Sequence, residues 1–456
     1  MTELLVRSKA LTVNPLKVGQ SVGAALAFLG LARCMPLHHG ARGCTSFSKL
    51  FLMRHFREPI ALQTTAMEAA TAILGADDNG IEALRTVAER NAPDIIGLIT
   101  TGLSEMQGAD ILRMLKEFRA AHPRHAALAV VPVAAPDTEG CLETGFARAV
   151  EAIAAALLPQ VRPPRRQSRQ VNLLASPMHT VGDLEAIKEW IEAFGLRPVC
   201  LPDLADSLDG HLIAEGFSTL TYGGTPRADV ASMGESVATL VVGPSLDRAA
   251  DFLRQRTGVP DWRFAGLMGL QACDAFVQVL SEISGRPIPG TIERQRSQLL
   301  DAMLDCHAFL DAVPVAVAAD PDLLQALCEL LVGAGANVTV AVAPIAAAHL
   351  RELPIAEVVV GDLEDFEQLS RERQVDLLIA NSHGAEIAAR LSVPLLRAGL
   401  PLYDLIGGHA RTWVGYRGSR QTLFDIANLM ARHWKEIAPY RSIYWTGTPR
   451  ASEVVR

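Results

Sequence analysis

The segment that decides the fold is Asp94-Ile95-Ile96-Gly97-Leu98-Ile99-Thr100-Thr101-Gly102-Leu103-Ser104-Glu105, an apolar run that ends in a turn rich in Thr, Gly and Ser. The run is continuous rather than alternating, which is typical of a β-strand buried on both faces. The same order of apolar run, polar turn and amphipathic helix recurs along the chain, at Val171–Leu174, Ala238–Val242, Val315–Ala318, Val338–Val342 and Leu377–Ala380. Strands buried on both faces form parallel sheets covered by helices, so the sequence predicts an α/β fold.

The chain is long enough for several such units, since 456 residues correspond to roughly two to four domains. The clearest boundary is the basic, proline-rich stretch Val161–Arg169, which stands between an expected helix over Phe146–Leu158 and a new strand. A second boundary follows an expected helix at Ile292–Leu310, where Ala319-Asp320-Pro321 opens another strand-turn-helix unit. We therefore expect three doubly wound, Rossmann-like domains with parallel sheets, at about residues 1–165, 166–310 and 311–456.

Composition narrows the classes of partner and compartment. A formal net charge of −8 gives no electrostatic reason to expect nucleic acid or an anionic membrane as a partner. The most apolar N-terminal run, Val22–Ala32, is shorter than the roughly 18 residues that cross a bilayer, and no secretory cleavage site follows it. Seven scattered cysteines, an odd number, argue against a disulfide framework and for a reducing compartment. We expect a cytoplasmic protein whose partners are proteins or small ligands.

Common catalytic and nucleotide-binding motifs are absent from the sequence. The segment Gly19-Gln20-Ser21-Val22-Gly23 lacks the preceding strand and the third glycine of a dinucleotide-binding loop, and no Gly-Lys-Ser/Thr occurs. There is also no Gly-x-Ser-x-Gly elbow and no His-Glu-x-x-His helix. These absences count against ATP, NAD and hydrolase chemistry, and we assign no catalytic residue.

The cysteines include no Cys-x-x-Cys pair, so neighbouring ligands in this chain cannot build a complete zinc or iron–sulfur site. A lone cysteine is most often a small buried hydrophobe. We expect six of the seven cysteines to be buried in this way, namely Cys34, Cys141, Cys200, Cys273, Cys306 and Cys328. Cys34 is expected at the end of the first helix.

Cys44 has different neighbours, because it ends the glycine-flanked loop His38-His39-Gly40-Ala41-Arg42-Gly43-Cys44. Glycines at 40 and 43 let the backbone approach a bulky, sulfide-rich ligand closely. Arg42 favours the thiolate form that metals require. We therefore predict Cys44 as a metal ligand, with Gly43 lining the bound group. His38 and His39 are further candidate ligands, although one histidine packed inward and one solvated is the more common arrangement.

Six segments along the chain carry recognisable motifs. They are Lys9-Ala10-Leu11-Thr12-Val13-Asn14-Pro15-Leu16-Lys17, Met35-Pro36-Leu37-His38-His39-Gly40 through Cys44, Arg54-His55-Phe56-Arg57-Glu58-Pro59, Thr100–Glu105, Pro394-Leu395-Leu396-Arg397-Ala398-Gly399 and Gly415-Tyr416-Arg417-Gly418. Together these segments resemble the β branch of the nitrogenase component 1 family. The resemblance covers nearly the whole chain, and so many ordered motifs make it specific.

The resemblance implies a metal-cluster role for Cys44. Catalytic β subunits of this family supply three cysteines to a large interfacial cluster, and only the position of Cys44 keeps one here; Gly19 and Gly102 stand at the other two positions. A glycine has no ligand atom, so this chain cannot complete that eight-iron cluster. The resemblance instead implies an assembly scaffold in which Cys44 contributes to a 4Fe-4S cluster shared with a partner subunit.

The same resemblance implies the partners. A NifE-type subunit is expected to supply three further cysteines, to pair with this chain in a heterotetramer and to hold most of the iron-molybdenum cofactor precursor. The nitrogenase iron protein is expected to bind transiently, with the segment Cys44–Pro59, including Arg54 and Arg57, as a candidate docking surface.

Two other functions stay open. One is a subunit of an active reductase of the same superfamily, of the alternative nitrogenase or protochlorophyllide reductase type. The glycines at 19 and 102 count against the first type, and the match across Lys9–Pro59 counts against the second. The other is an α/β binding module without metal.

Overall fold

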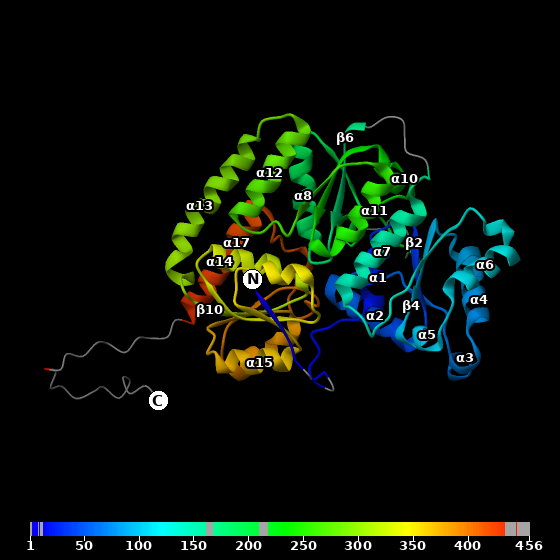
Figure 1. The fold of residues 1–456 in the computed structure, drawn as a ribbon, viewed down its shortest axis with the longest axis horizontal. Helices are drawn as coiled ribbons and strands as arrows, with labels where there is room; N and C mark the ends of the chain where they lie inside the picture. Colours follow the sequence, from blue (N-terminus) through cyan, green and yellow to red (C-terminus); the bar gives the residue numbers. More distant parts are fainter. Residues whose placement is uncertain are drawn as a thin grey trace.

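The computed structural model describes residues 2–7, 9, 12–160, 167–208, 218–433 and Tyr444 (Figure 1). It is an α/β structure with three parallel sheets, and the predicted fold class is confirmed. Each apolar run that predicted a strand forms one, and the expected helix at Ile292–Leu310 is present as α13 (Gly290–Leu310). The expected boundary at Val161–Arg169 falls largely on residues 161–166, which lie outside the described part of the chain.

The first sheet contains the apolar run Ile95–Ile99, and its strand order is β3-β2-β4-β5. Its strands are β2 (Cys34–His39), β3 (Gln63–Thr64), β4 (Ile95–Thr100) and β5 (Ala129–Val133). Its helices are α1 (Gln20–Leu29), α2 (Arg42–Phe56), α3 (Ala69–Leu74), α4 (Asp77–Asn91), α5 (Gly102–Gln107), α6 (Ile111–Ala121) and α7 (Leu142–Leu157), with the short 3-10 turn η1 (Pro123–His125).

Both faces of this sheet are buried, which explains the continuous apolar run. In β4, Ile95 and Ile99 pack into one hydrophobic cluster, whereas Ile96 and Leu98 pack into another on the opposite face. Successive side chains of a strand point to opposite faces, so a strand covered on both sides needs apolar residues at every position.

The second sheet has strand order β7-β6-β8-β9. Its strands are β6 (Gln167–Ala175), β7 (Arg197–Cys200), β8 (Ser236–Val242) and β9 (Asp261–Phe264). The associated helices are α8 (Val181–Ala193), α9 (Leu204–Ser207), α10 (Arg227–Ser232), η2 (Met233–Glu235), η3 (Pro244–Leu246), α11 (Asp247–Thr257), α12 (Leu270–Ser284) and α13.

The third sheet has six strands in the order β1-β12-β11-β10-β13-β14. The strands are β1 (Glu3–Val6), β10 (Pro314–Ala318), β11 (Asn337–Ala343), β12 (Glu357–Val360), β13 (Leu377–Ala380) and β14 (Leu395–Arg397). The helices are α14 (Pro321–Gly333), η4 (Ala348–Glu352), α15 (Leu363–Glu372), η5 (Ser382–Gly384), α16 (Ala385–Leu391), η6 (Gly408–Ala410) and α17 (Gly415–Arg432).

The first strand of the chain departs from the expected division into consecutive segments. β1 pairs in parallel with β12, with Glu3 opposite Glu357 and Val6 opposite Val360. The N-terminal residues therefore belong to the sheet built mainly from residues 314–397 rather than to the first sheet. The division at about residues 1–165, 166–310 and 311–456 stays a prediction for the rest of the chain.

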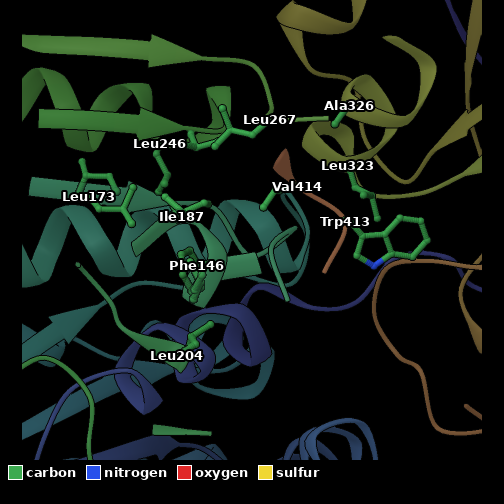
Figure 2. Close-up of a cluster of buried hydrophobic side chains, with 14 of the residues drawn as sticks. Phe146, Leu173, Ile187, Leu204, Leu246, Leu267, Leu323, Ala326, Trp413 and Val414 are labelled. Atoms are coloured by element: carbon green, nitrogen blue, oxygen red, sulfur yellow. The ribbon is translucent and has the colours of Figure 1, made fainter. Parts of the chain in front are cut away.

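One hydrophobic core joins the three sheets. Phe146 of α7, Leu173 of β6 and Leu323 of α14 belong to the same buried cluster, together with Trp413 just before α17. Figure 2 shows these side chains with Leu246, Leu267 and Ala326 at the place where elements from the three sheets meet. A shared apolar core of this kind holds the sheets in a fixed arrangement.

Two glycines bring α1 and α7 into close contact beneath the first sheet. A Cβ at Gly23 would overlap the backbone oxygen of Leu142, and a Cβ at Gly145 would overlap the backbone oxygen of Gln20. Because backbone atoms cannot move aside as side chains can, the helices pack this closely only with glycine at both positions. This contact fixes the start of α1, where Gly19 lies.

Candidate functional site

Cys44 lies in the first turn of α2, directly after strand β2, and its side chain is exposed. The other six cysteines are buried, as the sequence interpretation expected. The expected loop at residues 38–44 is wrong in detail, because His38 and His39 are the last residues of β2 and the helix begins at Arg42. Cys34 also departs from expectation, since it begins β2 rather than ending a helix. Among all seven cysteines, the accessible thiol is that of Cys44.

The two glycines near Cys44 have different roles. A Cβ added at Gly43 would meet no atom within 4 Å, so nothing in the described chain requires glycine at this position. A Cβ at Gly40 would overlap the Thr101 hydroxyl, so this glycine serves the contact between the ends of β2 and β4. The space at Gly43, next to Cys44 in the sequence, is therefore open, whereas the space at Gly40 is filled by Thr101.

Both histidines of β2 are buried, so the expectation of one solvated histidine is wrong. The Nε2 atom of His38 lies 3.2 Å from the carbonyl oxygen of Ser21, and the Nδ1 atom of His39 lies 3.0 Å from the Thr65 hydroxyl. Burial lowers the pKa of His38 to about 4 and also lowers the pKa of His39. Both rings are neutral at physiological pH, and partners within the fold fix their orientation.

Gly19 and Gly102, which the resemblance places at the other two cysteine positions, both lie beside the carboxylate of Asp137. Gly19 caps the N-terminus of α1, and Gly102 is the first residue of α5. A Cβ at Gly19 would lie 2.6 Å from Oδ1 of Asp137, and a Cβ at Gly102 would lie 2.8 Å from Oδ2 of the same residue. Sequence reasoning did not find Asp137, because the loop after β5 carries no motif that singles it out.

Topology places these residues at one edge of the first sheet. Cys44, Gly102 and Asp137 follow β2, β4 and β5, which are neighbours in the sheet and run parallel. The Thr101 hydroxyl donates to the carbonyl oxygen of His39 over 3.0 Å and joins the ends of β2 and β4. Ligands of doubly wound folds bind at this carboxyl edge of the strands, so the geometry supports a binding site here.

The C-terminal end of α2 is tied to the third sheet. The backbone N–H of Leu402 donates to Nδ1 of buried His55 over 2.9 Å. The guanidinium of Arg54 lies 4.3 Å from the centroid of the Tyr403 ring, and Nη2 of Arg57 donates to the backbone oxygen of Tyr403 over 2.7 Å. The sequence indicated Arg54 and Arg57 as surface residues, whereas the structure shows that both also contact residue 403. These contacts hold the helix that carries Cys44.

A row of apolar side chains is exposed on α2 at spacings of three residues from Cys44. Phe47, Leu50 and Met53 are 63%, 50% and 42% exposed. Ile73 and Leu74 at the end of α3 and Met106 of α5 are also exposed, and α3 contacts α5. Exposed apolar side chains in a row, such as those on α2, are typical of surfaces that contact other proteins.

Neither a metal cage nor a membrane span is found in the described part of the chain. No group of three or more His, Cys, Asp and Glu side chains there has the geometry to hold a metal ion. No helix in the same residues is both long and apolar enough to pass through a bilayer.

Comparison with known proteins gives extensive similarity. The chain is 44% identical over 442 residues to "Nitrogenase iron-molybdenum cofactor biosynthesis protein NifN" of Klebsiella pneumoniae, a match that covers 97% of this chain and 96% of that protein. The protein of the same name from Nostoc sp. is 46% identical over 429 residues, with 94% and 95% coverage.

Solved structures agree with this similarity. A chain of the structure "Nitrogenase Cp1 at pH 6.5" is 30% identical, superposes with a TM-score of 0.87 and covers 94% of this chain, with 95% of that chain matched. A chain of "Nitrogenase Cp1 at pH 5", at 14% identity and a TM-score of 0.72, shares the fold. The profile of the family described as "Nitrogenase component 1 type Oxidoreductase" matches residues 19–431. The chain therefore belongs to the nitrogenase component 1 type oxidoreductase family.

Proposed function

We propose that this chain is a subunit of the scaffold on which the nitrogenase iron-molybdenum cofactor is assembled. Similar proteins from several bacteria carry the name of a cofactor biosynthesis protein and match almost end to end. In this proposal the chain pairs with a NifE-type subunit in a heterotetramer, and the two subunits share a 4Fe-4S cluster. The scaffold works in the cytoplasm and has no catalytic site of its own in this chain.

The observation that carries the proposal is the exposed thiol of Cys44 on an apolar surface. Of seven cysteines, this is the one that a cluster outside the chain can reach. Cys44 lies in the first turn of α2, and the N-terminus of a helix favours an anionic ligand such as a sulfide-rich cluster. The open side of Gly43 leaves room beside the thiol for a group bulkier than a single metal ion.

The ligand count fits a shared cluster. A cubane needs four ligands, and this chain offers one thiolate at the site, so the partner would supply the other three cysteines. When bound, the cluster would link the two subunits, and metal binding and association would stabilise each other. The exposed residues Phe47, Leu50 and Met53 supply apolar area for the same interface.

The iron-molybdenum cofactor precursor would be held mainly by the partner, and this chain would complete the complex on which it matures. The nitrogenase iron protein would dock transiently near α2, on the segment Cys44–Pro59.

Anaerobic co-purification with a NifE-type partner tests the proposal. Iron content and the electron paramagnetic resonance spectrum would be compared for the wild type, Cys44→Ala and Cys306→Ala, a buried cysteine of α13 that serves as the control. We expect Cys44→Ala to lose cluster iron and to weaken association while the chain stays folded by circular dichroism. We expect Cys306→Ala to keep its iron.

Two outcomes would contradict the proposal. Unchanged iron in the Cys44→Ala complex would show that this thiol is not a ligand. A colourless, iron-free wild-type complex would favour an α/β binding module instead.

A further inference from the structure

The loop that follows β5 places the carboxylate of Asp137 between the starts of two helices. The backbone N–H of Gly102, at the start of α5, donates to Oδ2 of Asp137 over 3.2 Å. From the segment before α1, Nζ of Lys17 donates to the backbone oxygen of Asp137 over 3.2 Å. The side-chain amide of Gln20 donates to the carbonyl oxygen of Pro136 over 2.6 Å and holds the same loop. Contacts from both sides therefore fix the backbone of this loop, and the hydrogen bond from Gly102 orients the exposed carboxylate itself.

The two glycines beside Asp137 are explained by this carboxylate and not by their backbone angles. Gly19 has φ −66° and ψ 153°, which any residue adopts, and Gly102 has no positive φ either. The nearest atoms that added side chains would meet are the two oxygens of Asp137, at 2.6 Å from a Cβ at 19 and 2.8 Å from a Cβ at 102. Both distances are shorter than van der Waals contact. A side chain at either position would push the carboxylate out of its place.

The carboxylate lies at the same edge of the sheet as Cys44. β2, β4 and β5 are neighbours, and parallel strands are about 4.8 Å apart, so the ends that carry Cys44 and Asp137 are separated by about two strand spacings. Negative charge is favourable at helix N-termini, and here the Asp137 carboxylate supplies it for α1 and α5. A sulfide-rich cluster with thiolate ligands is itself anionic, so the negative charge of Asp137 would repel a cluster that extended towards Gly19 and Gly102.

We propose that Asp137 is a specificity-determining residue of the shared cluster site, and this inference rests on the function proposed above. Its carboxylate fills the space beside Gly19 and Gly102 and closes that side to further thiolates and iron. The site is thereby limited to the small cluster that Cys44 helps to hold.

A double-mutant cycle on the full chain tests, without any metal, whether the Asp137 carboxylate occupies the space beside Gly19. Gly19→Ala, Asp137→Ala and the double variant would be compared with the wild type by thermal unfolding. Asp137→Ala removes both oxygens but keeps a Cβ that would lie 3.5 Å from a Cβ at 102, an ordinary contact. We expect Gly19→Ala to lower Tm in the wild-type background and to lower it less when residue 137 is alanine. Equal losses in the two backgrounds would overturn the placement of the carboxylate.

Iron loading of the complex with the partner tests the limit on cluster size. Gly19→Cys/Gly102→Cys would be compared with the same pair in an Asp137→Ala background, by iron quantitation and electron paramagnetic resonance. We expect iron above the wild-type level only when Asp137 is also replaced. One outcome would overturn this inference and leave the proposed function standing. In it, the wild-type complex holds iron that is lost in Cys44→Ala, but the double-cysteine chain binds the same amount of iron with Asp137 as with Ala at 137. A wild-type complex without such iron would overturn the proposed function and this inference with it.

Discussion

The carboxylate of Glu143 on α7 accepts a hydrogen bond from the backbone N–H of Asp322 in the first turn of α14, with 2.9 Å between oxygen and nitrogen. Both side chains are buried. The Asp322 carboxylate in turn accepts hydrogen bonds from the Ser245 hydroxyl over 2.6 Å and from the Ser245 backbone N–H over 3.2 Å, and Nε2 of His349 lies 3.5 Å away. Helices of the first and third sheets and the turn after β8 of the second sheet thus meet around two acidic residues.

The acidic contact makes stability depend on pH. Burial raises the pKa of Glu143 well above its usual value, and the neighbouring carboxylates of Asp322 and Asp320 raise it further. Burial also raises the pKa of Asp322, and it raises the pKa of Asp320 to about 6. The folded state therefore keeps protons that the unfolded chain releases above about pH 4, and this contribution to stability declines as pH rises.

Glu143→Gln should increase the free energy of unfolding at pH 8 and lose that advantage near pH 5. Glutamine keeps an oxygen that can accept the Asp322 N–H, but it carries no charge. The gain should be of the order of 1 kcal/mol or more, because a pKa raised by one pH unit corresponds to about 1.4 kcal/mol. Denaturant unfolding from pH 5 to 8 measures it. Glu117→Gln on the exposed face of α6 is the control, and identical pH slopes in the wild type and Glu143→Gln would contradict the prediction.

His55→Leu should destabilise the chain by about 1–3 kcal/mol at pH 8, because the buried N–H of Leu402 loses its acceptor. Burial, and secondarily the nearby His409, lowers the pKa of His55 to about 3. The wild-type contribution is thus present above about pH 6.5 and declines as the pH falls, so the difference between wild type and variant should shrink at pH 5. Unfolding at both pH values gives the comparison, with exposed His307→Leu as the control. A difference that grows on acidification would refute this account.

Gly23→Ala should lower the free energy of unfolding, whereas Gly43→Ala should not lower it. At Gly23 the new Cβ overlaps the Leu142 backbone, and overpacking of this kind costs about 1–3 kcal/mol. At Gly43 the Cβ meets open space in a helix, where alanine is favoured over glycine by up to about 1 kcal/mol. Unfolding of the isolated chain should show a loss for the first variant and no loss for the second. With the partner present, Gly43→Ala should hold less iron than the wild type; full iron loading would show that the open side of Gly43 is not used.

Arg57→Glu should weaken association with the nitrogenase iron protein more than Arg57→Gln does. Both variants remove the hydrogen bond from Nη2 to the Tyr403 backbone oxygen, so this shared loss cancels in the comparison. The difference that remains is the reversed charge at an exposed position on the proposed docking surface. Binding measured at two salt concentrations would test it. Equal affinities for the two variants would remove Arg57 from the docking surface.

Local patterns in the sequence predicted much of the fold. Runs such as Ile95–Ile99 and Leu377–Ala380 are apolar at every position because both faces of their sheets are covered, and this can be read without a structure. β2 was harder to recognise, because Pro36, His38 and His39 interrupt its apolar character. The contacts to Nε2 of His38 and Nδ1 of His39 come from Ser21 and Thr65, which lie elsewhere in the chain.

The sequence by itself determined the fold class, the strand-turn-helix order and Cys44 as the candidate ligand, because hydrophobic periodicity and motif residues are local properties. Tertiary structure decided which distant residues meet. β1 joins a sheet formed more than 300 residues later, both oxygens of Asp137 lie beside Gly19 and Gly102, and Glu143 contacts Asp322 in a shared core. These contacts depend on how the sheets pack against one another, and no local spacing encodes that arrangement. For the same reason, the fold alone revealed that Cys44 is the exposed thiol.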